Sequence, residues 1–227
     1  MLLFITKTLT MLLSYHNDET IEAGIDEAGR GPLFGRVYTS CVILPQNGFD
    51  YSNIKDSKRF TSDKKIRLVA EHIKQNAIAY AVTYRDEKQI DKDNILQATI
   101  HSMHEAICKL AIKPDCILVD GHYFKPYTIF NASQGKLEQI PHICCKGGDN
   151  KYVSIAAASI LSKVSRDDYI NDLCKRFAFL DEYYGLSKNK GYGTKQHMEG
   201  IKTYGITRWH RLSFSPCSSQ KVIDLEY

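Results

Sequence analysis

The order of the apolar segments constrains the fold of this 227-residue chain more than any other feature. Segments of strand length that are rich in β-branched residues alternate with segments whose apolar residues recur every three or four positions, as on one face of a helix. The expected strands cover residues 21–25, 37–44, 77–84, 116–119 and 139–144, and the expected helices cover residues 62–73, 94–110, a segment from about 154, and 195–204. This order predicts an α/β domain with a mixed sheet whose first two strands are antiparallel neighbours.

Two of the expected helices carry additional local evidence. Ser62 has the side chain of a helix N-cap and is followed by Ile66, Val69 and Ile73, whose spacing places them on one buried face. Residues 155–162 are mostly alanine and serine around a few larger apolar residues. Small side chains allow a helix to approach a sheet closely, so this helix is expected to pack directly against the sheet.

Positive charge gathers near the C-terminus, although the chain as a whole is only mildly basic at a net charge of +4. Residues 185–212 hold six cations and one acid, a net charge of +5, which leaves −1 for the rest of the chain. These residues are Lys188, Lys190, Lys195, Lys202, Arg208 and Arg211 against Glu199. The segment is expected to lie as a basic arm beside the core, which is compatible with a polyanionic partner.

The cysteines and the N-terminus bear on where the protein acts. The seven cysteines are odd in number and form no Cys-x-x-Cys pair, which favours a reducing cytoplasm over a disulfide framework or a zinc ribbon. Residues 1–14 are apolar but short, with Lys7 in the middle and no small-residue cleavage site. We interpret residues 1–20 as a leader whose order the sequence does not define. No apolar run is long enough for a membrane span.

Four acids are expected at the edges of secondary structure elements. Asp26 and Glu27 follow the first expected strand, Asp120 follows another, and Asp149 precedes a helix. Strand ends of open α/β sheets meet at a crevice, and converging carboxylates without histidine or thiolate favour Mg²⁺ or Mn²⁺ over zinc. A single acid at such a place is more often an ordinary surface residue. Asp26 and Glu27, as neighbours, can share a site only if the strand ends or twists there.

Glycines flank a cation directly after the first two acids. Gly29-Arg30-Gly31 would let the backbone approach a ligand closely, or it could simply form a hairpin turn. The glycine spacing does not match a dinucleotide-binding loop, and Gly147 and Gly148 do not begin a Walker loop. Residues 55–59 place three cations and a hydroxyl before a helix, which suits either phosphate contact or plain surface charge.

Among the remaining candidates, Tyr192 has the most informative surroundings. It lies between Gly191 and Gly193 in the basic segment, where an aromatic ring can stack on a sugar or base while the cations hold phosphates. With 14 tyrosines in the chain, chance placement is the alternative. His101 and His104 lie one helical turn apart without an evident third ligand, so we interpret them as exposed helix residues rather than a metal site.

Taken together, several segments are similar to bacterial ribonuclease HII, a type 2 ribonuclease H. The run Asp26-Glu-Ala-Gly-Arg-Gly31 is the most specific of them. In chain order the matching segments are residues 23–35, 55–58, 117–121, 146–149, 154–167, 191–194 and 210–214, which cover most of the chain after residue 20.

The resemblance implies an RNase H-like mixed β-sheet flanked by helices, with a helical C-terminal extension. It divides the chain into the leader at 1–20, a catalytic domain at 21–184 and a basic substrate-binding extension at 185–227. It implies an endoribonuclease that hydrolyses the RNA strand of RNA–DNA hybrids and cuts at ribonucleotides embedded in duplex DNA, leaving 5′-phosphate and 3′-hydroxyl ends. Such an enzyme would use two Mn²⁺ or Mg²⁺ ions and act in the cytoplasm as a monomer without membrane contact.

The resemblance also assigns roles to individual residues. The catalytic and metal-binding acids would be Asp26, Glu27, Asp120 and Asp149. Gly29, Arg30 and Gly31 would read the ribose 2′-hydroxyl, Tyr192 would stack at the RNA-to-DNA junction, and Ser57, Lys58 and Thr194 would contact nucleic acid.

The chain departs from the family's usual pattern in two places. The family usually has one glycine before its fourth acid, where this chain has Gly147 and Gly148, and usually has proline in place of Gly193. The alternatives are a ribonuclease HIII-like nuclease, a non-catalytic module that binds RNA–DNA hybrids, and another polynucleotidyl transferase such as a recombination nuclease. Ribonuclease HIII usually carries a further N-terminal domain and a glutamate as fourth acid, and the loop at 29–31 argues against the recombination nuclease.

Overall fold

A five-stranded mixed sheet organises the molecule. The computed structural model describes residues 12–131 and 133–223, and within them the strand order is β3-β2-β1-β4-β7. The first three strands in the chain pair antiparallel, whereas β1, β4 and β7 run parallel. The strands are β1 Glu22–Ala28, β2 Val37–Ile43, β3 Ala79–Arg85, β4 Cys116–Asp120 and β7 His142–Cys145. The predicted mixed sheet and the antiparallel first pair are confirmed.

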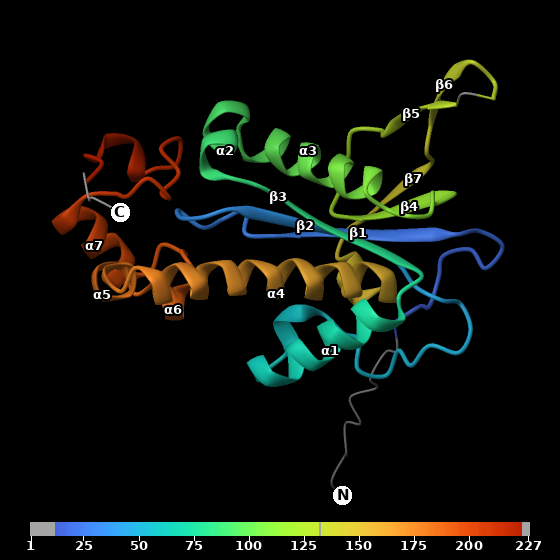
Figure 1. The fold of residues 1–227 in the computed structure, drawn as a ribbon, viewed down its shortest axis with the longest axis horizontal. Coiled ribbons are helices and arrows are strands. Elements are labelled where there is room, and N and C mark those ends of the chain that lie inside the picture. Colours follow the sequence, from blue (N-terminus) through green and yellow to red (C-terminus); the bar gives the residue numbers. More distant parts are fainter. Residues whose placement is uncertain (1–11, 132, 224–227) are drawn as a thin grey trace, which may run out of the picture.

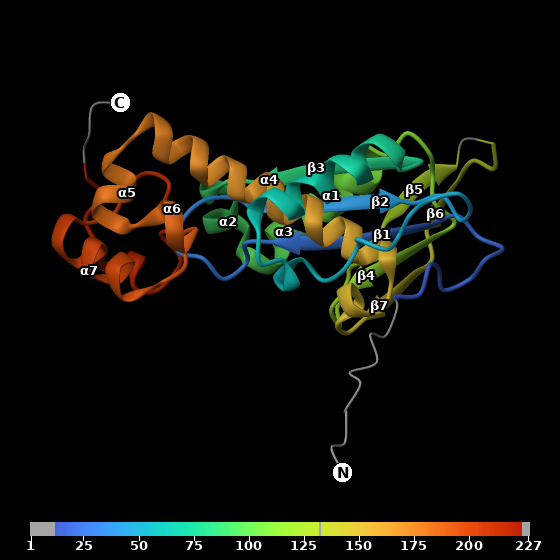
Figure 2. The ribbon, with the colours of Figure 1, turned by 90° about the horizontal axis from the view of Figure 1, so that it is seen from below.

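Helices cover both faces of this sheet and then gather beyond one end of it (Figure 1). One face carries α1 (Asp63–Asn76) and α4 (Val153–Arg176), and the other carries α2 (Glu87–Asp93) and α3 (Ile95–Cys108). Figure 2 shows α4 extending past the sheet into a C-terminal group of helices. That group comprises α5 Phe179–Tyr184, α6 Leu186–Asn189 and α7 Lys195–Tyr204.

The contact between α4 and β1 is close because small residues line it. A Cβ placed on Gly24 would lie 2.1 Å from the carbonyl carbon of Ser154, so only glycine fits there. Ala156, Ala157 and Ala158 are fully buried in the core on this face of the sheet. The short side chains thus fix α4 directly against β1, as predicted, and α4 in turn supplies one wall of the cavity described below.

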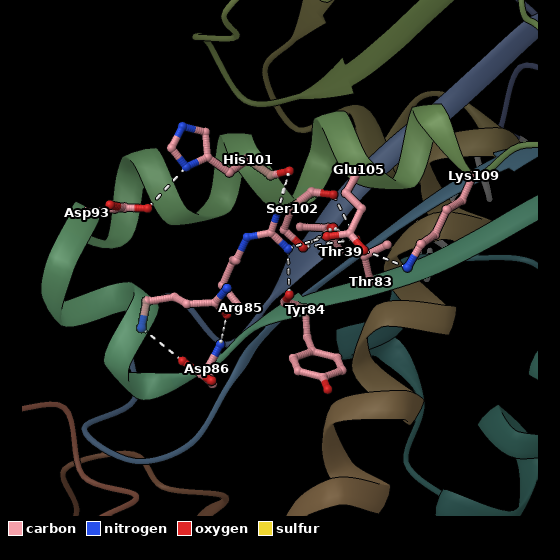
Figure 3. Close-up of polar contacts among 11 residues, drawn as sticks. Thr39, Thr83, Tyr84, Arg85, Asp86, Asp93, His101, Ser102, Glu105 and Lys109 are labelled. Carbon is pink, nitrogen blue, oxygen red and sulfur yellow. Dashed lines mark hydrogen bonds and ion pairs between the residues drawn. The ribbon is translucent and has the colours of Figure 1, made fainter.

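The opposite face of the sheet combines an apolar core with three buried hydroxyl groups. Figure 3 shows Thr39 of β2, Thr83 of β3 and Ser102 of α3 converging. The Thr39 hydroxyl lies 2.8 Å from that of Thr83 and 2.8 Å from that of Ser102. Each buried hydroxyl therefore has a partner, which removes the penalty of burying an unpaired polar group and fixes α3 across the two strands.

The C-terminal helices share one apolar cluster with the end of α4. The buried cluster joins Leu173 of α4, Tyr184 of α5, Leu186 of α6 and Ile201 of α7. Thr194 caps α7, accepting a hydrogen bond from the backbone of His197, so this helix begins where the sequence predicted. The division of the chain at residue 185 stays a prediction, because the cluster includes residues on both sides of it.

Some elements differ from the sequence-based expectation. The segment expected as one strand at 139–144 is divided between a β5–β6 hairpin (Thr128–Asn131 and Lys136–Gln139) and β7. The hairpin and α2 were not predicted. Both are short and hold few buried apolar residues, so their apolar pattern is weak. Of the expected leader, residues 1–11 lie outside the described residues, and Leu13 pairs through its backbone with Lys151 and Val153.

Three short 3₁₀ helices complete the described chain: η1 Ser57–Arg59, η2 Gly148–Asn150 and η3 Cys217–Ser219. Within residues 12–131 and 133–223, no helix has the length and apolar character needed to cross a lipid bilayer.

Candidate active site

The first two acids lie within β1 and not after it, which corrects the sequence-based expectation. Strand β1 continues to Ala28, where Asp26 pairs with Ser40 of β2 and Glu27 pairs with Thr39. Asp26 therefore faces α4, where Ser162 donates to its backbone carbonyl, and Glu27 faces the side of α3.

The end of a neighbouring strand brings these two acids into one site. Pairing between β1 and β4 stops at Ile25 and Val119, and the next residue of β4 is Asp120, its last. Beyond this point β1 has a free edge, so side chains from both of its faces reach the same opening. Asp26, Glu27 and Asp120 all line one cavity of about 490 Å³.

The electrostatics of this cluster favour a bound cation. Burial raises the pKa of Asp26 well above its ordinary value, and the neighbouring charges of Glu27 and Asp120 raise it further. Burial also raises the pKa of Glu27, which Arg30, 3.4 Å away, opposes. The negative charges of these buried carboxylates repel one another and are not fully compensated by nearby cations. A bound divalent cation would compensate them.

Asp149 adjoins this cluster from the loop before α4. It lies in η2 and is only 4% exposed. Burial, followed by the charge of Asp120, raises the pKa of Asp149, while Lys58, 3.8 Å from its carboxylate, acts in the opposite direction. Asp149 is not among the residues lining the cavity.

Both glycines before Asp149 have a structural reason. Gly147 has φ +64°, a conformation that favours glycine. A Cβ on Gly148 would lie 2.5 Å from Ile155. The second glycine thus fits a loop that has room for no side chain at this point.

The donor set fits a hard divalent cation. Its members are carboxylates alone, which suits Mg²⁺ or Mn²⁺. Among the described residues, no three Asp, Glu, His or Cys side chains are already arranged as a ligand set. Their oxygens are instead engaged by neighbours: Asp120 by Gly148, Glu27 by Arg30, and Asp26 by the backbone N–H of Glu27.

The loop after β1 forms the next part of the cavity wall. Gly29, Arg30 and Gly31 all line the cavity, and Gly29 has φ +94°. A Cβ on Gly29 would lie 2.1 Å from the side chain of Arg166, so the loop packs against α4 at a distance that only glycine permits.

The cavity lining also includes aromatic and basic side chains. Tyr192 lines it and is 51% exposed, and its backbone carbonyl lies 3.0 Å from Nδ1 of His197, which holds the turn in place despite Gly193. Ser57 and Lys58 also line the cavity, with the Ser57 hydroxyl 3.0 Å from that of Ser159 and the Lys58 ammonium 3.8 Å from the Asp149 carboxylate. Thr194 does not line the cavity but caps α7.

Comparison with known proteins identifies the family. The family model described as Ribonuclease HII matches residues 23–217. The chain belongs to the ribonuclease HII family. The ribonuclease HII of Parabacteroides distasonis is 45% identical over 94% of this chain and 99% of that protein, and that of Phocaeicola vulgatus is 41% identical over 96% and 100%. The crystal structure of ribonuclease H2 from Pyrococcus horikoshii OT3 superposes with a TM-score of 0.69 at 25% identity, over 87% of this chain and 95% of that one.

Ribonuclease HII is a metal-dependent endonuclease of the ribonuclease H class, a group that acts on RNA–DNA hybrids. The expected RNase H-like α/β fold, with its flanking helices and helical C-terminal part, is confirmed. The match spans residues 23–217 and favours ribonuclease HII over the ribonuclease HIII-like and non-catalytic alternatives.

The ribonuclease HII cavity also contains residues that sequence reasoning missed. Helix α4 contributes Ser159, Lys163, Arg166 and Asp167 to its wall, and Lys188, Asn189 and Lys190 contribute from the C-terminal segment. The signal for the α4 group was present, because spacings of three and four residues place these side chains on one helix face. Only the fold shows that this face looks toward the acids.

The structure also shows the surroundings of Arg211 and of the two histidines of α3. Arg211 was counted in the basic arm, yet it is fully buried and contributes no surface charge. His101 points to Asp93, with 3.2 Å between them (Figure 3). His104 lies 2.7 Å from the carbonyl of Lys125. His101 is exposed, as the sequence-based interpretation expects, whereas His104 is partly buried.

Proposed function

We propose that Asp26, Glu27, Asp120 and Asp149 hold two divalent cations, Mn²⁺ or Mg²⁺, and that this enzyme incises duplex DNA at a single embedded ribonucleotide as well as the RNA strand of hybrids. The observation that carries the proposal is one cavity that the acids of β1 and β4, the 29–31 loop and Tyr192 line together. A scissile phosphate at the acids thus lies beside groups suited to a ribose and a flanking sugar or base.

Within this proposal the chain's own residues have separate tasks. The carboxylates bind the cations, which supply Lewis acidity and acidify water when bound. Lys58, 3.8 Å from the Asp149 carboxylate, and Lys163 line the cavity and hold the phosphate backbone, so binding is independent of base sequence and weakens with salt. Products with 5′-phosphate and 3′-hydroxyl ends follow from attack by water at phosphorus with departure of the 3′ oxygen.

Recognition of RNA depends on the backbone of Gly29, Arg30 and Gly31, which contacts the ribose 2′-hydroxyl, the group that distinguishes RNA from DNA. Tyr192 stacks on the nucleotide at the RNA-to-DNA junction. Ser57, which lines the cavity, contacts the substrate, and Thr194 acts by capping α7.

The same proposal extends to assembly and location. Every residue assigned to the site belongs to one chain, so a single copy of the protein suffices. The seven cysteines carry free thiols, which suits a reducing cytoplasm, where we place the enzyme.

Incubation with duplex DNA containing one ribonucleotide tests the proposal. We expect a single incision at the ribonucleotide in the presence of Mg²⁺ or Mn²⁺, no incision in EDTA, and no incision of the matched all-DNA duplex. Cleavage of long hybrids without incision at a lone ribonucleotide would contradict the proposed substrate range, and cleavage in EDTA would contradict the role of the acids.

A further inference from the structure

A buried arginine from the C-terminal segment binds the backbone of the 29–35 loop. Arg211 is fully buried, and no carboxylate of the described residues forms an ion pair with it. Its guanidinium instead donates to four backbone carbonyls of this loop: Gly29 at 2.6 Å, Arg30 at 3.0 Å, Pro32 at 2.8 Å and Gly35 at 2.8 Å. Four carbonyls of a single loop therefore point at one cation.

This arrangement fixes the direction of two amide groups. In a trans peptide the C=O and N–H bonds point in opposite directions. Because the carbonyls of Gly29 and Arg30 point at Arg211, the N–H groups of Arg30 and Gly31 point away from it. Gly29, Arg30 and Gly31 line the cavity, so this direction is the substrate side.

These two amide groups are available to a ligand. Within the part of the chain that the structure describes, neither the N–H of Arg30 nor that of Gly31 donates to another residue. Backbone donors with no internal partner normally bond to water or to a ligand. A ribose hydroxyl at the cavity wall meets this requirement.

The remainder of the loop is held from the same side. The N–H of Gly35 donates to the carbonyl of Trp209, and the N–H of Arg211 donates to that of Leu33, each at 2.9 Å. Arg166 donates to the carbonyl of Phe34 at 3.1 Å. The loop thus cannot rotate its peptide planes without breaking several of these bonds together.

Arginine is the side chain suited to this place. Its planar guanidinium presents donors in a fixed fork, whereas lysine has a compact ammonium group with a different geometry. Burial, followed by the charge of Arg166, lowers the pKa of Arg211 to about 9. Burying the guanidinium charge is unfavourable, and the hydrogen bonds to the four carbonyls offset this desolvation cost.

We propose that Arg211 is a positioning residue for ribose recognition: by binding the carbonyls of Gly29 and Arg30, it turns the following amide groups toward the 2′-hydroxyl of the substrate. This inference rests on the proposed function of the 29–31 loop. It also gives the C-terminal segment a role in discriminating RNA from DNA, besides its role in holding the duplex.

The experiment compares wild type with Arg211→Lys on two duplexes. One carries a single ribonucleotide, and the other carries a 2′-deoxy-2′-fluoro nucleotide at the same position, whose fluorine accepts a hydrogen bond from an N–H group far more weakly than a hydroxyl oxygen does. We expect Arg211→Lys to lower kcat/KM on the ribonucleotide duplex by about tenfold or more, because a site built for a hydroxyl loses this preference when its polar groups are misplaced. Activity on the fluoro duplex should change much less, so the ratio between substrates falls.

Two results would overturn the inference. Suppose that wild type prefers the ribonucleotide duplex to the fluoro duplex. If Arg211→Lys shows the same ratio of activities on the two duplexes, because neither activity changes or because both fall in the same proportion, Arg211 acts only on stability. If wild type itself does not discriminate, the ribose-reading role of the loop fails and the inference fails with it. Arg176→Lys is the matched control, since Arg176 stacks on Phe177 and touches no loop carbonyl; its ratio should equal that of wild type.

A measurement on wild type keeps the inference testable if Arg211→Lys does not fold. The backbone amide resonances of Arg30 and Gly31 are followed in EDTA on addition of the ribonucleotide duplex or the all-DNA duplex. We expect both resonances to move further downfield with the ribonucleotide duplex, as hydrogen bonding to the hydroxyl requires. Equal movement with the two duplexes, or no movement, would overturn the inference.

Discussion

The backbone N–H of Gly148 donates a 2.7 Å hydrogen bond to Oδ1 of Asp120. This bond joins the end of β4 to the loop that carries Asp149, so it fixes two acids from distant parts of the chain relative to each other. It also determines which substitutions at Asp120 are informative.

Asp120→Asn should abolish metal-dependent cleavage while leaving the fold intact. The asparagine oxygen can still accept from Gly148, but the side chain loses the negative charge that binds a cation. We expect cleavage of the single-ribonucleotide duplex to fall by at least about 100-fold, the scale of losing one preorganised electrostatic group. Binding of the hybrid in EDTA should stay close to that of wild type, and retained full cleavage would remove Asp120 from the site.

Asp26→Asn should stabilise the metal-free protein at neutral pH. Burial and the charges of Glu27 and Asp120 raise the pKa of Asp26 in the folded state above its unfolded value. The stability gained by protonating Asp26 is therefore present at low pH and is lost as the pH rises through the raised pKa. Asparagine is uncharged, so the folded variant avoids the cost of an ionised side chain at residue 26. Its Tm near pH 7 should therefore be a few degrees higher than that of wild type, because each kcal/mol of stability corresponds to about 2–4 °C for a chain of this size.

The control for Asp26 has the opposite sign. Hydrogen bonds from Ser187 lower the pKa of Asp181, whose carboxylate thus contributes stability above its unfolded pKa and loses it as the pH falls. Asp181→Asn should therefore lower Tm at neutral pH. In addition, Mn²⁺ should raise the Tm of wild type more than that of Asp26→Asn. A Tm for Asp26→Asn at or below that of wild type in EDTA would contradict the assigned electrostatics.

Asp149→Ala should increase the metal concentration needed for half-maximal cleavage. Asp149 is buried beside Asp120, with Lys58 as a nearby cation. Loss of a ligand or of its direct neighbour weakens metal affinity by about 10- to 100-fold. A Mn²⁺ titration of cleavage rate measures the shift, and Asp172→Ala, which removes an exposed acid paired with Lys175, is the control. An unchanged titration would place Asp149 outside the metal site.

Tyr192→Ala should impair incision at a lone ribonucleotide more than cleavage of a long hybrid. A lone ribonucleotide offers one junction at which the ring can stack, and stacking on an aromatic side chain contributes about 1–3 kcal/mol per base. We expect a loss of about 5- to 150-fold on that substrate. Tyr192→Phe keeps the ring and should retain most activity. Equal losses on both substrates for Tyr192→Ala would exclude stacking at the junction.

The sequence predicts well where local signals and burial agree. Ser62 caps α1 and the apolar spacing of Ile66, Val69 and Ile73 marks its buried face, as the structure confirms. Helix α2 was missed because Ile90 is its single buried apolar residue, although Asp86 and Gln89 form a capping box that signals its start.

The candidate site shows a different limit. The acids were identified from their order, but the way Asp26 and Glu27 share a site depends on where β4 ends, which no local pattern reveals. Arg211 was assigned to the surface because cations are rarely buried. Its partners are backbone carbonyls of residues 29–35, far away in the sequence. Every residue has such a carbonyl, so the sequence gives no signal for this contact.

The hydrogen bond from Arg211 to Gly29 spans 182 positions. A ribosome adds about 5–20 residues per second, starting from the N-terminus, so β1 and its loop are synthesised long before the arginine that shapes them. The loop can reach its final form only after the chain has been synthesised as far as Arg211. Nascent chains on the ribosome thus already possess the acids of β1 and β4 while they still lack the contact that completes the neighbouring loop.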